Sequence, residues 1–126
     1  MSNDAKPGPR LALENASRRF GALIAVDGMN LELVPGRVHA IAGENGAGKS
    51  TAMKMLAGHL TASAGAVRVD GQLLQPATPQ EAMRRGIGMV HQHFMLVEAF
   101  TALENLVLGA EPTSTLGALD LDHAAV

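Results

Sequence analysis

Alternating apolar and polar positions predict strands in the first third of the chain. Apolar side chains recur at every second position over residues 10–16 and 29–34. Successive side chains of a strand point to opposite faces, so this period indicates strands with one buried face. Two short, continuous apolar runs, residues 38–42 and 87–90, predict buried strands of the kind found in parallel sheets.

Helical spacing and capping signals predict three helices. Over residues 49–60, four apolar side chains fall on one face of a helix. Thr78 and Thr101 each precede a glutamate by three residues, which is the spacing of a capping box. These signals predict helices that begin after each threonine and end at Gly86 and near Gly109.

The order of the predicted elements indicates the class of the fold. Asp70-Gly71 separates residues 66–70 from residues 72–74 and predicts a hairpin. Strands and helices otherwise alternate, so we expect an α/β fold with an antiparallel part near the N-terminus. Proline and glycine in residues 1–9 predict a flexible leader, and residues 10–126 are expected to form one domain.

The composition excludes several classes of protein. With 47% hydrophobic and 17% charged residues, the chain is not a disordered charged tail. No apolar run approaches the ~20 residues of a membrane-spanning helix, and the start of the chain does not resemble a secretory signal. The absence of cysteine excludes disulfide frameworks and thiolate metal sites. A net charge of -2 and 2% aromatic residues argue against nucleic acid as a partner.

A glycine-rich loop carries the strongest chemical signal. Residues 43–51 read Gly-Glu-Asn-Gly-Ala-Gly-Lys-Ser-Thr and fit the phosphate-loop pattern G-x-x-x-x-G-K-[ST] in full. The glycines let successive N–H groups point at one anion, and the helix that begins at Lys49 directs its positive end at the same point. In this pattern Lys49 reaches the β- and γ-phosphates, Ser50 ligates Mg²⁺ and Thr51 bonds the α-phosphate. The predicted nucleotide-binding residues of the loop are Gly43, Asn45, Gly46, Ala47, Gly48, Lys49, Ser50 and Thr51.

The loop and its flanks resemble the ATPases of ATP-binding cassette (ABC) transporters. Upstream, residues 19–33 are similar to the opening of that family, in which an aromatic residue stacks on adenine; Phe20 is the match. Downstream, residues 86–96 resemble the family's Q-loop, with Gln92 in the place of the glutamine that ligates Mg²⁺ and senses the γ-phosphate. The sequence of residues 86–109 is most similar to the ATPases of importers for simple sugars and nucleosides.

The sequence also departs from the family. The Leu-Ser-Gly-Gly-Gln signature, the apolar strand that ends in Asp-Glu and the switch histidine do not occur in it. Residues 116–122 contain a glycine and no Asp-Glu pair, so they do not supply that strand. The resemblance therefore implies that residues 10–126 form a partial ABC ATP-binding domain, a P-loop NTPase core that is incomplete at the C-terminus.

The resemblance implies an ATP-binding subunit of a bacterial importer that couples ATP binding and hydrolysis to the uptake of sugars or nucleosides. It implies ATP and Mg²⁺ as cofactors, Lys49 and Gln92 as catalytic residues, and Ser50 and Gln92 at the metal. The implied partners are membrane permease subunits, a second ATP-binding domain in a dimer and, indirectly, a solute-binding protein. The implied location is peripheral, on the cytoplasmic face of the inner membrane. ATPase activity is expected of a full-length member and is left open for this chain.

Alternatives remain for the function and for single residues. The alternative to the importer subunit is a soluble ABC-type ATPase or a nucleotide-sensing module that binds no permease. The apolar run after Gln92 favours the importer subunit, because it would supply a contact with the permease. Phe20 is alternatively a core residue, and Gln92 a surface residue at the end of a strand. His91 and His93 share a face but have no evident third metal ligand, so we interpret them as polar residues beside a loop. Met95 contacts the permease or fills a core.

Overall fold

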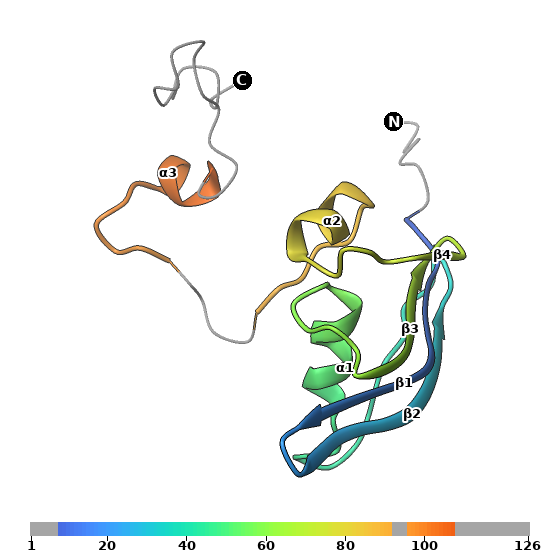
Figure 1. Ribbon diagram of the computed structural model, residues 1–126. Helices are drawn as coiled ribbons and strands as arrows, with labels where there is room; N and C mark the ends of the chain where they lie inside the picture. The colour runs from blue at the N-terminus through green and yellow to red at the C-terminus, as the bar shows by residue number, and fades with distance from the viewer. Residues whose placement is uncertain (1–7, 92–95, 108–126) are drawn as a thin grey trace. The chain divides into compact units, whose positions relative to one another are not determined.

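A four-stranded antiparallel sheet is the framework of the chain (Figure 1). The computed structural model describes residues 8–91 and 96–107, and the chain divides into two units, residues 1–89 and 90–126. The sheet belongs to the first unit and has the order β2-β1-β3-β4. Its strands are β1 (Leu11–Phe20), β2 (Leu23–Leu33), β3 (Ala64–Val69) and β4 (Gln72–Leu73).

The β1–β2 hairpin is longer than the sequence predicted. The two strands pair from Leu11 opposite Leu33 to Phe20 opposite Leu23. The register shifts at several points of β1, and Asn15 lies in the left-handed region with φ 46°. Such irregularities interrupt the two-residue period of side chains. The alternation therefore revealed only the first half of β1 and the second half of β2.

Helix α1 (Lys49–Leu56) packs against this sheet and closes the core. Met55 and Ala52 are fully buried beneath Leu13 and Ala16 of β1, in one cluster with Val67 of β3. Full burial of a large apolar side chain such as Leu13 or Met55 stabilises the fold by about 1.5–3 kcal/mol. Of the face predicted from the sequence, Ala52 and Leu56 are buried in this cluster and Met53 and Leu60 are partly buried, whereas the buried Met55 was not predicted.

The end of α1 comes earlier than predicted, because a glycine stops the helix. Gly58 has φ 73° and donates its N–H to the carbonyl of Met55 at 3.1 Å. The N–H of His59 reaches back to the carbonyl of Lys54 at 2.8 Å. These two bonds form a Schellman motif, which satisfies the last helical carbonyls and turns the chain toward β3.

Both predicted capping threonines begin helices, but only Thr101 forms the reciprocal capping box. Thr78 accepts the N–H of Glu81 at 3.3 Å and starts α2 (Pro79–Arg84). Thr101 accepts the N–H of Glu104 at 3.3 Å, and the Glu104 carboxylate accepts the Thr101 N–H at 2.7 Å. This reciprocal pair starts α3 (Ala102–Val107) and, through the backbone N–H and hydroxyl of Thr101, lowers the pKa of Glu104. The predicted helix end near Gly109 lies outside the described residues.

The two strands predicted from continuous apolar runs are wrong. Residues 38–42 and 87–90 have irregular backbone, and Val38 and Val90 are 100% and 92% exposed. A strand exists only where another strand accepts and donates its backbone hydrogen bonds, and parallel strands lie paired and covered on both faces. Within residues 8–91 and 96–107 no parallel strand lies beside either run. The apolar run alone is thus insufficient to make the strand.

The N-terminus of α1 sits directly on the backbone of β2. Gly48, the N-cap of the helix, has φ 88°. A Cβ atom added there would lie 2.3 Å from the carbonyl oxygen of Ala25 and 3.0 Å from Cγ2 of Val26. Only glycine permits both this backbone conformation and this close approach. The contact places the loop that precedes α1 beside the β1–β2 hairpin.

We predict that Gly48→Ala destabilises the chain more than Gly46→Ala does. Both glycines have φ near 90°, but a Cβ on Gly46 would meet nothing within 4 Å. Gly46→Ala should therefore cost only the left-handed strain of about 1–2 kcal/mol. Gly48→Ala should add about 1–3 kcal/mol of overpacking against β2. Urea unfolding followed by circular dichroism measures both losses, and equal losses would show that the approach to Ala25 carries no constraint.

Candidate functional site

The loop before α1 presents free backbone donors at the positive end of the helix. The N–H of Ala47 donates to the carbonyl of Glu44 at 3.2 Å and closes a tight turn. The first helical bond runs from the N–H of Ala52 to the carbonyl of Gly48 at 2.9 Å. The N–H groups of residues 49–51 precede that bond and have no acceptor within the helix. No side chain caps this helix end, so its donors and dipole suit an anion.

The ammonium group of Lys49 lies over the same loop. Its Nζ donates to the carbonyl oxygens of Gly43 and Glu44, each at 2.6 Å. An ammonium has three donors, so these bonds hold the lysine in place and leave a donor for a phosphate oxygen. The loop residues from Ala42 to Ala47 are exposed. The arrangement therefore combines an accessible anion cradle with a fixed positive charge.

Two hydroxyl side chains follow in the first turn of α1. Ser50 is exposed and Thr51 is half-buried. A hydroxyl oxygen beside bound phosphates is a suitable hard ligand for Mg²⁺, so the chemistry of Ser50 fits the predicted metal role. The structure thus brings the whole predicted set, from Gly43 to Thr51, into one loop and one helix start.

Phe20 is the last residue of strand β1. It belongs to the β1–β2 hairpin, which also contacts Gly48 of the loop before α1. It is 43% exposed and pairs with Leu23, two residues before Ala25 on β2. Two residues of strand span about 7 Å, which places Phe20 at the same end of the hairpin as Ala25. The exposure of the ring argues against the alternative of a core residue, and the stacking role stays a prediction.

An additional residue at the ring was missed by the sequence analysis. The guanidinium carbon of Arg18 lies 4.8 Å from the centroid of the Phe20 ring. Arg18 and Phe20 are two residues apart on one strand, which places both side chains on the same face. That spacing was visible in the sequence and could have indicated the pair.

Several predicted residues cannot be placed. Gln92, His93 and Met95 lie outside the described residues, so the roles expected of them stay predictions. His91 is described and exposed. Among residues 8–91 and 96–107, no three His, Cys, Asp or Glu side chains gather as metal ligands.

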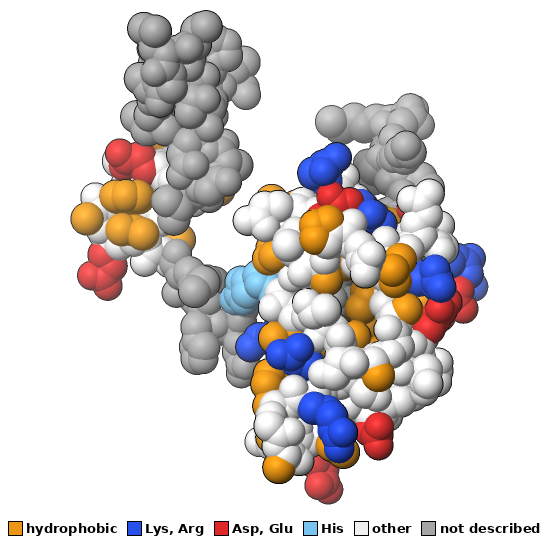
Figure 2. Space-filling model, in the orientation of Figure 1, with side chains coloured by type: hydrophobic (Ala, Val, Ile, Leu, Met, Phe, Trp, Pro, Cys, Tyr) orange, Lys and Arg blue, Asp and Glu red, His pale blue; other side chains and the backbone are white. Residues whose placement is uncertain are grey.

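The surface gives no competing anion site on the face shown in Figure 2. There the Lys and Arg side chains occupy several separate places and do not merge into one basic surface. On this face, what the loop offers to an anion is its backbone donors and Lys49, and not a field of surface charge.

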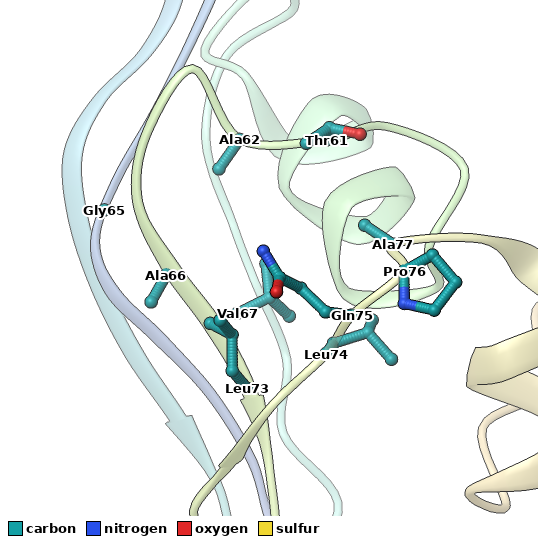
Figure 3. A pocket seen from close by; sticks show the side chains of 10 residues that line it. All are labelled: Thr61, Ala62, Gly65, Ala66, Val67, Leu73, Leu74, Gln75, Pro76 and Ala77. Carbon is teal, nitrogen blue, oxygen red and sulfur yellow. The ribbon is translucent and has the colours of Figure 1, made fainter.

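A groove beside β3 and β4 differs from the loop before α1, because its lining is mostly apolar. It has a volume of about 510 Å³, and its lining carries no ionisable side chain. Figure 3 shows small and aliphatic side chains around it, with Gln75 and Thr61 as its polar members. No residue of the loop 43–51 lines it, so it is separate from the phosphate site. Its lining residues are Thr61, Ala62, Gly65, Ala66, Val67, Leu73, Leu74, Gln75, Pro76 and Ala77.

The relatives found by comparison with known proteins are import ATP-binding proteins. The chain is 53% identical over 110 residues to the nucleoside import ATP-binding protein NupA of Lactococcus lactis. It is 42% identical over 103 residues to the ribose import ATP-binding protein RbsA 2 of Escherichia coli O157:H7. These alignments cover 87% and 82% of this chain but 22% and 20% of the relatives. The chain thus spans about a fifth of the length of the importer proteins that it matches.

Solved structures give the same answer for the fold. A nucleotide-free ATP-binding cassette from an ABC transporter superposes with a TM-score of 0.74 at 33% identity, covering 86% of this chain and 44% of the cassette. The ADP conformation of another such cassette gives 0.71 at 33% identity, covering 81% and 40%. The chain therefore has part of the P-loop ATPase fold expected from its sequence.

No helix within residues 8–91 and 96–107 combines the length and apolar character needed to cross a membrane.

The sequence pattern that defines the ABC transporter family matches residues 26–125, which is more than half of the chain. The chain belongs to the ABC transporter family of ATP-binding domains.

Proposed function

We propose that this chain binds Mg-ATP through residues 43–51 and Phe20, as the ATP-binding part of a bacterial importer for sugars or nucleosides. The observation that carries the proposal is the uncapped N-terminus of α1, with the Lys49 ammonium held over the loop by two carbonyl groups. Members of the family are ATPases, and a solved cassette that resembles this chain is in its ADP conformation.

Each part of the loop has a distinct task in this proposal. The backbone N–H groups of residues 48–51 donate to the phosphate oxygens, and Lys49 neutralises charge between the β- and γ-phosphates. Ser50 and Gln92 are the proposed ligands of Mg²⁺, which supplies further neutralisation of the phosphates when bound. Phosphoryl transfer depends mainly on positioning and electrostatics, so the residues of this chain bind and orient the nucleotide.

The transport role is proposed from the relatives. The matched proteins are named as nucleoside, guanosine, glucose and ribose import ATP-binding proteins. By this likeness, the partners are permease subunits, a second ATP-binding domain and, through the permease, a solute-binding protein. The proposed location is the cytoplasmic face of the inner membrane. A full-length member of the family would hydrolyse ATP there, with Lys49 and Gln92 among its catalytic residues.

We predict that Lys49→Ala weakens the binding of Mg-ATP by at least ~1.5 kcal/mol, roughly tenfold, because a charge-assisted bond to the phosphates is lost. Lys54→Ala is the matched control, since this exposed lysine lies on the same helix outside the loop. Titration calorimetry measures both affinities, and circular dichroism checks that each variant is folded. Equal affinity of the wild type and Lys49→Ala would refute the phosphate role of the loop.

Phe20→Ala should weaken ATP binding by about 1–3 kcal/mol, the range of base–aromatic stacking. GTP should lose a similar amount, because stacking uses the face of the base and not its edge. Wild-type preference for ATP over GTP should accordingly be mild. Leu23→Ala, which removes an exposed apolar side chain from the same hairpin, serves as the control. Exclusion of GTP by more than ~100-fold would reveal a base-specific contact that this proposal lacks.

The transport role and its alternative, a soluble ABC-type ATPase or nucleotide sensor, differ in one measurable property. We predict that the chain sediments with membranes that contain a sugar or nucleoside permease of the importer class, and not with matched membranes that lack it. The apolar run after Gln92 would supply the contact. Equal recovery from both membranes would favour the soluble alternative.

A further inference from the structure

We propose that Arg18 is a positioning residue that holds the Phe20 ring in place for the adenine base. The inference rests on the proposed stacking role of Phe20. It adds a second residue that determines how much the base contributes to the affinity for the nucleotide. It arises from the contact between the guanidinium of Arg18 and the ring, at 4.8 Å from the ring centroid.

The geometry places the guanidinium against one side of the ring. A cation within about 6 Å of a ring centroid is attracted by the negative face of the aromatic system. Phe20 is 43% exposed, whereas Arg18 is half-buried. The arginine thus covers part of the ring from the protein side, and the exposed part is left for a ligand.

Arg18 is itself held by the segment that follows α1. Its Nη1 donates to the carbonyl of Thr61 at 2.7 Å. Next to this bond, the N–H of Arg19 donates to Oγ of Ser63 at 3.1 Å, and the N–H of Ser63 donates to the carbonyl of Ser17 at 2.7 Å. The end of β1 is therefore attached to the chain just beyond α1, and the position of the guanidinium is fixed by backbone.

The charge of Arg18 has the Phe20 ring as a principal partner. Among the residues that the structure describes, no carboxylate forms a salt bridge with Arg18, and its buried Nε has no hydrogen-bond partner. Cation–π attraction grows when the cation is removed from water. The contact between Arg18 and Phe20 is accordingly more than an incidental surface approach.

A fixed ring stacks on a base at lower cost than a free one. Ordering a mobile side chain on binding costs free energy that is subtracted from the affinity. With Arg18 in place, much of that ordering is complete before the nucleotide binds. Loss of Arg18 should weaken ligands that carry a base and leave ligands without a base unchanged.

The test compares ATP with ribose 5-triphosphate, which has the sugar and the triphosphate but no base. Affinities with Mg²⁺ are measured for the full chain as wild type and as Arg18→Met, Arg18→Lys and Arg19→Met. The ratio of the two affinities should fall roughly 2- to 30-fold in Arg18→Met, the range of a cation–π contact. Arg18→Lys should retain part of the ratio, because a point charge replaces a planar group. Arg19→Met removes the same charge from an exposed neighbour and should leave the ratio unchanged.

Each other outcome overturns the proposal in a recognisable way. Equal weakening of both ligands in Arg18→Met would assign the residue a merely structural role, and an unchanged ratio would deny it any role at the base. If the wild type binds both ligands equally and Phe20→Ala changes nothing, the stacking role of Phe20 fails first and the role of Arg18 with it. In a Phe20→Ala background, Arg18→Met should have no further effect on the ratio.

A measurement without ligand tests the same contact independently. The chain contains no Trp and no Tyr, so the Phe20→Trp variant carries a single fluorescent side chain at this point. Its time-resolved anisotropy should show greater fast motion when Arg18→Met is added, and no change when Arg19→Met is added. Unaltered motion in the Arg18→Met background would show that the guanidinium does not hold the ring.

Discussion

The close approach of Gly48 to the Ala25 carbonyl is the constraint on which the site depends. It brings the positive end of α1 onto β2, where no side chain beyond hydrogen fits. Helix α1 is then held along its length by the burial of Met55 and Ala52 against the sheet. A phosphate loop needs only a short backbone segment in the correct conformation, and here that conformation is imposed by packing on both sides of the glycine.

The segment that follows this helix is also attached to the β1–β2 hairpin. Beyond α1, the carbonyl of Thr61 accepts the Arg18 guanidinium, and Ser63 bonds to β1 through its N–H and its hydroxyl. The hairpin therefore contacts the start of α1 and the segment that follows it. These two attachments join Phe20 and the phosphate loop to one hairpin, as the proposed nucleotide site requires.

The features that the sequence predicted well are those that local chemistry decides. The caps at Thr78 and Thr101 each involve four consecutive residues; Thr78 forms the N-cap bond, and Thr101 forms the full capping box with Glu104. Part of the loop 43–51 is equally local: the turn from Glu44 to Ala47 and the bonds of Lys49 to Gly43 and Glu44 lie within seven residues, whereas the conformation of Gly48 depends also on β2. Such elements can be predicted because few outside contacts are needed to form them.

The predictions that were wrong or incomplete concern features that depend on contacts between distant parts of the chain. The strands expected over residues 38–42 and 87–90 depend on partner strands that the described residues do not supply, so their apolar pattern had nothing to pair with. The full length of β1 was hidden by register shifts near Asn15, which depend on how two strands meet. The bond that holds Arg18 could not be predicted, because its acceptor belongs to Thr61, forty-three residues away in the chain.

This division between local and distant contacts also bears on solute specificity. Proteins named for the import of nucleosides, guanosine, glucose and ribose all match this region, with 53%, 46%, 44% and 42% identity. The proposed site is made of backbone N–H groups, one lysine and an exposed ring, and this chemistry suits a triphosphate and the face of a base. A region shared by importers of different solutes is expected to carry the chemistry they have in common. For these named relatives, we expect the choice of solute to depend on parts other than the region that matches this loop and its hairpin.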